Sequence, residues 1–160
     1  MRETPILTCF DIASYFIKLA NTTGSYISNL KLQKLVYYAQ AWYLANYGMP
    51  LFEEDFQAWV HGPVIPELYQ QYNGFQWKPI IVRIEETTVP DDILDFLEEV
   101  ADVYFPRDAY ELEKMTHLED PWIEARGDLP PDVPSNEIIT KESMKRYYSA
   151  RVEEQEEAVA

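Results

Sequence analysis

Residues 59–72 read Trp-Val-His-Gly-Pro-Val-Ile-Pro-Glu-Leu-Tyr-Gln-Gln-Tyr, and this stretch carries the sharpest local signals of the chain. Gly62 and Pro63 interrupt any regular element, whereas Pro66 has the fixed φ that suits the first turn of a helix. Glu67 follows, where a carboxylate favours the positive end of the helix dipole. The stretch therefore predicts an extended segment, a tight corner and a short helix. A corner with aromatic residues on both sides can serve packing or can hold a recognition surface still.

Apolar residues recur at helical spacing over most of the remaining chain. The longest predicted helix starts at Ser28-Asn29 and stops at Gly48, with Pro50 just beyond. Start signals for the others lie near Thr8, Pro66, Pro90, Asp108, Asp120 and Lys141. We therefore predict a mainly α fold, a compact single domain of about six helices.

Two short segments have the character of strands. Phe56 to Val60 alternates in polarity, and Ile80 to Ile84 is rich in β-branched residues. We expect them to pair as a small two-stranded β element around residues 56–60 and 80–84, packed against helices. Three prolines in residues 128–136 predict a stiff loop. The domain is expected to span residues 1–152, and the acidic residues 153–160 to form a frayed tail.

The charge balance limits the classes of partner. The chain has 13 Lys and Arg against 28 Asp and Glu, a formal charge of −15, and such a field repels phosphate backbones and anionic lipid. This argues against direct nucleic-acid binding. A basic protein partner would be attracted to such a chain, although the acidity alone is explained by solubility. Cys9 is the only cysteine, which excludes an internal disulfide, and no apolar run is long enough for a membrane span. We expect a cytoplasmic protein.

The residues offer little for catalysis or metal binding. His61 and His117 are the only histidines, and neither they nor Cys9 show the local spacing of a metal site. The 5 glycines are not clustered into a phosphate-binding loop. We therefore predict no catalytic residue, no metal and no cofactor. One alternative stays open, a hydrolase or transferase that uses the two histidines as acid and base.

Four segments in this order resemble the Panacea antitoxin domain, also described as SocA-like or GepA-like. They are Leu32–Leu44 (Leu-Gln-Lys-Leu-Val-Tyr-Tyr-Ala-Gln-Ala-Trp-Tyr-Leu), Gly48–Phe52 (Gly-Met-Pro-Leu-Phe), Phe56–Tyr69 and His117–Arg126 (His-Leu-Glu-Asp-Pro-Trp-Ile-Glu-Ala-Arg). The resemblance covers about three quarters of the chain. It implies a mainly helical domain that binds protein and is not an enzyme.

What the resemblance implies about function is neutralisation of a cognate protein toxin by direct binding. Toxins neutralised by the family include alarmone-synthetase-like enzymes, and many members occur in phages. One branch of the family is a protease adaptor that delivers its toxin to a Clp-type protease, and this alternative also stays open.

The candidate residues divide into a scaffold and a contact surface. The motif residues expected to act as scaffold are Trp42, Trp59, Gly62, Pro63, Pro66, Tyr69, His117, Pro121 and Trp122. Partner choice should depend on exposed side chains around them. The partner-binding candidates, on the long helix and around the corner, are Lys31, Lys34, Tyr37, His61, Glu67 and Gln70.

Overall fold

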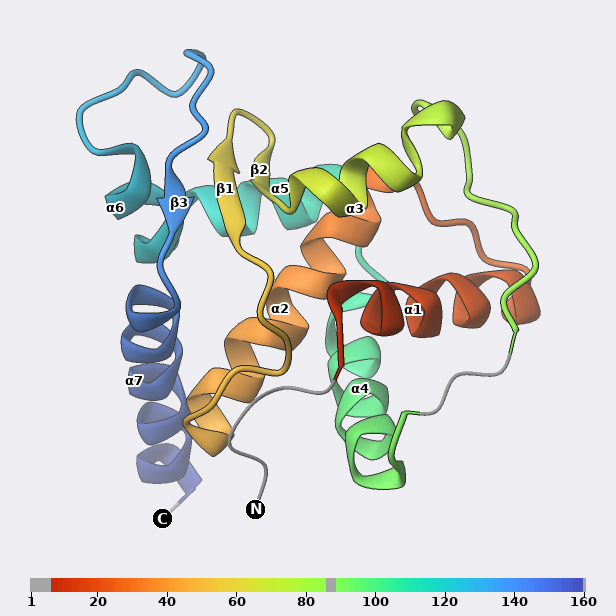
Figure 1. Ribbon diagram of the computed structural model, residues 1–160. Helices are drawn as coiled ribbons and strands as arrows, with labels where there is room; N and C mark the ends of the chain where they lie inside the picture. Colours follow the sequence, from red (N-terminus) through yellow and green to blue (C-terminus); the bar gives the residue numbers. More distant parts are fainter. Residues whose placement is uncertain (1–6, 86–88, 160) are drawn as a thin grey trace.

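The computed structural model describes residues 7–85 and 89–159 (Figure 1). Helix α2 (Asn29–Tyr47) passes through the middle of the molecule, with other elements on several sides. It contacts α1 (Cys9–Thr23), α4 (Asp91–Tyr104), α5 (Ala109–His117) and α7 (Lys141–Val159). Because it is surrounded, α2 buries polar side chains as well as apolar ones: Asn29, Gln33, Lys34 and Gln40. The mainly α prediction is confirmed.

Local signals set the ends of the first two helices. Thr8 and Asp11 form a capping box at the start of α1, and Gly24 ends that helix at φ +73. The Ser28 side chain caps α2 by accepting from the backbone N–H of Lys31, and Gly48 ends it in the left-handed conformation. Each cap satisfies backbone groups that a helix end leaves unpaired.

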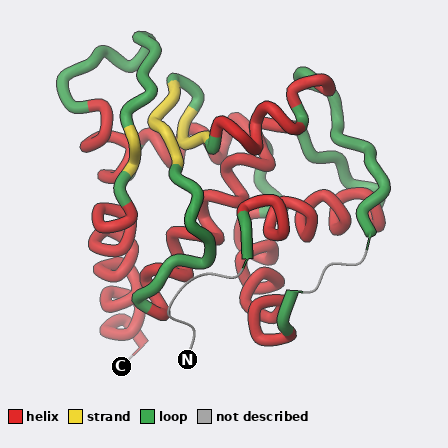
Figure 2. Tube along the Cα trace, viewed as in Figure 1, coloured by secondary structure: helices red, strands yellow, loops and turns green. Residues whose placement is uncertain are grey.

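The sheet differs from the predicted one. It has three antiparallel strands in the order β2-β1-β3 and lies at one end of the molecule (Figure 2). Strand β1 (Phe56–Trp59) pairs with β2 (Gly62–Val64) through a two-residue turn, so the predicted corner is a β-hairpin. The third strand is β3 (Ile138–Ile139), with Phe56 opposite Ile139.

The expected strand at residues 80–84 is wrong, because that segment is a loop. The backbone N–H of Ile80 donates to the Ile27 carbonyl at 2.8 Å, and the Asn21 amide donates to the Ile80 carbonyl at 3.2 Å. The segment is therefore held against the α1–α2 connection, with Ile80 buried and Ile81 66% exposed. Both sides of β1 are already occupied by β2 and β3.

The remaining helices are short, except at the C-terminal end. They are α3 (Pro66–Gln71), a 3-10 turn η1 (Asn73–Phe75) and α6 (Asp120–Arg126). Helix α7 continues to Val159, beyond the predicted start of the acidic tail at residue 153. Glu, Gln and Ala in that segment favour helix, and no Gly or Pro interrupts it. No helix of the described chain is long and apolar enough to cross a membrane.

Candidate partner-binding site

The β1–β2 hairpin is built on a close approach between its glycine and a buried lysine. Gly62 has φ +107, and a Cβ there would lie 2.6 Å from Lys34 Cε and 2.9 Å from Thr116 Oγ1. Lys34 is 1% exposed, and its Nζ donates to the Pro63 carbonyl at 3.1 Å. Desolvation lowers the pKa of Lys34 to about 7, partly opposed by the charge of Glu113. Lys34 therefore supports the hairpin from the interior of the protein. Our expectation that Lys34 contacts a partner is wrong, because its side chain is buried.

The last of the four family segments, His117–Arg126, supports strand β1 of the hairpin. Trp122 Nε1 donates to the Trp59 carbonyl at 2.8 Å, and Arg126 Nη1 donates to the Ala58 carbonyl at 2.9 Å. The His117 ring stacks on Trp122 with centroids 4.0 Å apart. Burial lowers the pKa of His117, which favours the neutral imidazole. The α5–α6 segment thus holds β1 through side-chain donors.

Glu119 of the same motif is half-buried and is the centre of a polar cluster. Its Oε1 accepts from Tyr38 and from Tyr148, each at 2.7 Å, and the hydroxyls of Tyr148 and Tyr37 are hydrogen-bonded at 3.2 Å. Burial raises the pKa of Glu119, although the two hydroxyl donors oppose that shift. Tyr37 is 0% exposed. The expectation that Tyr37 anchors a partner is therefore wrong, because α7 covers that face of α2.

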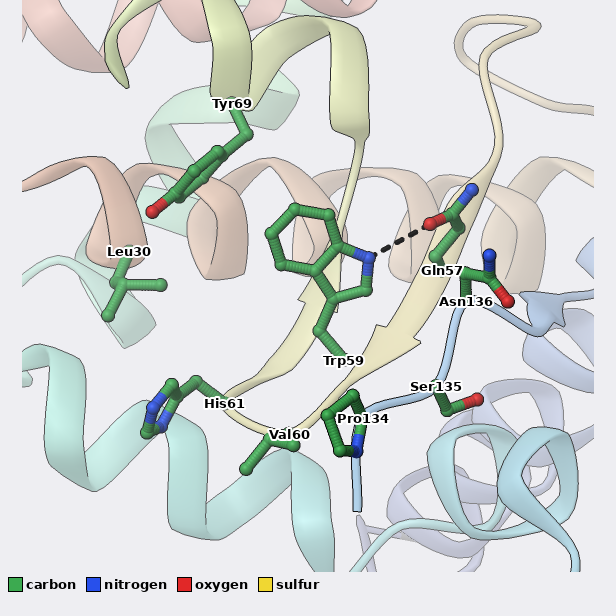
Figure 3. A pocket seen from close by; sticks show the side chains of 9 residues that line it. All are labelled: Leu30, Gln57, Trp59, Val60, His61, Tyr69, Pro134, Ser135 and Asn136. Atoms are coloured by element: carbon green, nitrogen blue, oxygen red, sulfur yellow. Dashed lines mark hydrogen bonds between the residues drawn. The ribbon is translucent and has the colours of Figure 1, made fainter. Parts of the chain in front are cut away.

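A pocket of about 430 Å³ opens beside the hairpin (Figure 3). We call it the corner pocket; its lining residues are Leu30, Gln57, Trp59, Val60, His61, Tyr69, Pro134, Ser135 and Asn136. The rings of Trp59 and Tyr69 lie edge to face at 5.1 Å, and Trp59 Nε1 donates to Gln57 Oε1 at 2.9 Å. Gln57, Ser135 and Asn136 lie on the side of Trp59 that faces away from Leu30 and Tyr69 (Figure 3).

The lining suits an apolar or aromatic side chain carried on a peptide. None of the nine lining residues is Asp, Glu, Lys or Arg, so an inserted charge would find no opposite charge in the wall. Aromatic walls supply contact area, while amide and hydroxyl groups can bond to a peptide backbone. The corner pocket is therefore a suitable concave surface for recognising a protein segment.

Of the predicted contact residues, the structure places one in this pocket. His61 is exposed at the turn, with Nδ1 2.9 Å from Glu113 Oε1. Glu67 and Gln70 are exposed on α3 outside the lining. Lys31 donates to the Phe105 carbonyl at 2.6 Å and lies over the Phe105 ring, so its charge is directed away from the corner.

Sequence reasoning missed four parts of the wall and assigned two others to scaffold. Trp59 and Tyr69 were predicted as scaffold and are both half-buried pocket walls. Leu30, Gln57, Val60 and residues 134–136 were not proposed, although the proline-rich loop was a signal for a stiff surface. Arg126 Nη2 donates to the Pro130 and Val133 carbonyls and so fixes this loop beside the hairpin.

The described residues give no support for a metal centre or a reactive thiol. Within residues 7–85 and 89–159, no group of three His, Cys, Asp or Glu side chains could hold a metal ion. Cys9 is buried, and burial together with nearby Glu54 raises the pKa of its thiol. A thiol in this state is a weak nucleophile at neutral pH.

Comparison with known proteins places the chain in a family. The sequence model of "Antitoxin SocA-like, Panacea domain" matches residues 32–123. The chain is 37% identical over 97 residues to "Antitoxin SocA" of Caulobacter vibrioides (strain NA1000 / CB15N), an alignment that covers 61% of this chain and 48% of that relative. The chain thus aligns with about half the length of this curated relative. No solved structure matches it. The family match spans more than half of the chain, and the protein belongs to the SocA-like, Panacea domain family of antitoxins.

Proposed function

We propose that this protein neutralises a cognate protein toxin by binding it directly, and that the corner pocket takes an apolar side chain of that toxin. The observation that carries the proposal is the position of the pocket on the family scaffold. Gln57, Trp59, Val60, His61 and Tyr69 lie inside the matched residues 32–123. The aromatic part of the wall therefore belongs to the region that defines the family.

The rest of the pocket lies outside that region. Leu30 precedes the match, and Pro134, Ser135 and Asn136 follow it. Specificity requires a difference in affinity between partners, which variable residues beside a common anchor site can supply. We propose that the family scaffold gives the pocket its shape, while the 134–136 loop selects the toxin.

The proposed function is tested first by isolating the partner and measuring its toxicity. Tagged protein is first used to isolate its partner from the native host, and the partner is then expressed alone and together with this protein. Growth arrest by the partner alone, with rescue on co-expression, is the expected result. Failure of the wild-type protein to bind or rescue would overturn the antitoxin proposal.

The pocket itself is tested by Asn136→Arg, which places a long charged side chain at an exposed wall position. We expect the dissociation constant to rise by at least about tenfold, the loss of one interface anchor. Thr22→Arg is the matched control, because Thr22 is exposed on α1 and does not line the pocket. Wild-type affinity of Asn136→Arg, with an unchanged melting temperature, would refute the pocket assignment.

The protease-adaptor and histidine-enzyme alternatives stay predictions. Co-expression separates the first from direct masking, because an adaptor lowers the amount of toxin in the cell and loses its effect when the protease is deleted. The enzyme alternative predicts that simultaneous His61→Ala and His117→Ala substitution abolishes rescue in a folded protein.

A further inference from the structure

A second concave surface lies between α2 and α4 and shares no lining residue with the corner pocket. This α2–α4 groove has a volume of about 240 Å³ and is lined by Trp42, Asn46, Phe96, Glu99, Val100, Val103 and Tyr104. Trp42 Nε1 donates to the Tyr104 hydroxyl at 2.6 Å, which fixes the indole in the wall. Val103 is 54% exposed at the rim. The groove is therefore an apolar, preformed surface open to solvent.

The charged residues of helix α4, beside this groove, are all acidic. Helix α4 carries six carboxylates and no Lys or Arg, and all six acidic residues are exposed: Asp91, Asp92, Asp95, Glu98, Glu99 and Asp102. Asp92, Asp95 and Glu99 follow one another at three- and four-residue spacing, which places them along the side of α4 that carries Val103. Glu98 and Asp102 lie toward α1 instead, where they contribute to raising the pKa of Tyr15.

Nearby basic side chains do not cancel this charge. Arg107, just beyond the end of α4, is paired with Glu111 at 2.5 Å. Lys145 of α7 donates to the Gly48 carbonyl at 3.4 Å, at the C-terminal end of α2. A row of carboxylates thus borders an apolar groove, and the charge complement is a basic segment with an apolar stripe.

We infer that the α2–α4 groove docks a basic amphipathic helix of the toxin, an inference that rests on the proposed function. The groove lies between two helices, and a third helix can lay its apolar ridge into such a surface. The 14 residues of α4 span about 21 Å, which matches about four turns of a partner helix. Leucine-type side chains would contact Val103 and the half-buried Trp42, while Lys or Arg at the flanks would face the α4 carboxylates.

The inference is tested first with a defined probe. The probe is a fluorescent helical peptide of about 18 residues that carries Leu at i, i+3, i+4 and i+7 and Lys elsewhere. A scrambled peptide of the same composition controls for net charge. We expect the amphipathic peptide to bind the full-length protein more tightly than the scramble does, and its affinity to fall between about 50 and 200 mM salt.

Two groove variants are compared with two matched controls. Val103→Asp should weaken peptide binding by at least about tenfold, whereas Leu118→Asp, at an 80% exposed site on another element, should not. The groove triple variant Asp92→Asn/Asp95→Asn/Glu99→Gln should weaken binding and flatten its salt dependence. The control triple Asp128→Asn/Asp132→Asn/Glu137→Gln removes the same number of charges from exposed loop positions, so it should bind like wild type.

Equal binding of the scramble, or equal effects of the two triple variants, would overturn the groove as the docking site. The same variants are then co-expressed with the toxin. Full rescue by both groove variants, despite weakened peptide binding, would overturn the toxin as the source of the helix. If wild-type protein gives no rescue at all, the proposed function fails, and the peptide measurements still decide whether the groove takes a basic helix.

Discussion

Replacing Gly62 by alanine should destabilise the fold more than the same change at another glycine with positive φ. Gly62 has φ +107 and Gly24 has φ +73, and a left-handed backbone costs an L-residue about 1–2 kcal/mol. A Cβ on Gly24 meets no atom within 4 Å, whereas one on Gly62 would lie 2.6 Å from Lys34 Cε. Gly24→Ala therefore measures the backbone cost alone.

The additional cost at Gly62 comes from the lack of space. Lys34 is buried and its Nζ is bonded to the Pro63 carbonyl, so the lysine cannot withdraw without losing that bond. Overpacking of a core costs about 1–3 kcal/mol. We therefore expect Gly62→Ala to lower the free energy of unfolding by this much more than Gly24→Ala does. For a chain of this length the difference corresponds to about 2–12 °C in melting temperature.

The assay is urea unfolding of wild type, Gly24→Ala and Gly62→Ala, with comparable m values as the check on two-state behaviour. Repeating the pair in a Lys34→Ala background should reduce the excess, because the nearest atom is then gone. Equal free energies of unfolding for the two alanine variants would refute the reasoning that the lysine contact requires glycine.

Three further predictions follow from the buried side chains. Since the pKa of Lys34 falls from about 10.4 in the unfolded chain to about 7 in the fold, the folded state binds fewer protons between these values. The stability of wild type relative to Lys34→Met should therefore rise from pH 7 to pH 9, approaching about 1.4 kcal/mol per pH unit, in urea unfolding; a flat difference would contradict it. Tyr37→Arg should unfold the protein or lower its stability by about 3 kcal/mol or more, because it buries an unpaired charge, whereas Gln70→Arg on the surface should change it by less than about 0.5 kcal/mol. Thermal melting of the two variants distinguishes these outcomes. Trp122→Phe should cost about 1–3 kcal/mol in urea unfolding, because it leaves the Trp59 carbonyl without its indole donor; an unchanged value would show that another donor replaces the indole.

Local sequence signals were sufficient for the helices. The Thr8 and Ser28 caps, the Gly48 stop and the Pro66 start are each interactions within a few residues, and the structure confirms all four. Such signals act through φ preference and nearby hydrogen bonds, which do not depend on the rest of the fold. The mainly α class followed from them.

Long-range packing decided the sheet and the burial of α2. Ile138–Ile139 pairs with a strand about 80 residues earlier, and no local pattern distinguishes that partner from the β-branched run at 80–84. Helical periodicity identifies one apolar face but not how many elements surround a helix. Tyr37 and Lys34 lie outside the apolar stripe of α2, and only the positions of α7 and the hairpin show that they are buried.

The corner pocket shows the same division. Its aromatic side chains, Trp59 and Tyr69, stand in one continuous stretch of sequence and were recognised there as important. Leu30 and Asn136 are brought into the lining by the start of α2 and by the loop that Arg126 holds. Residue type and spacing indicated a rigid corner, but a concave surface exists only where chain segments distant in sequence meet, and tertiary contacts alone create that meeting.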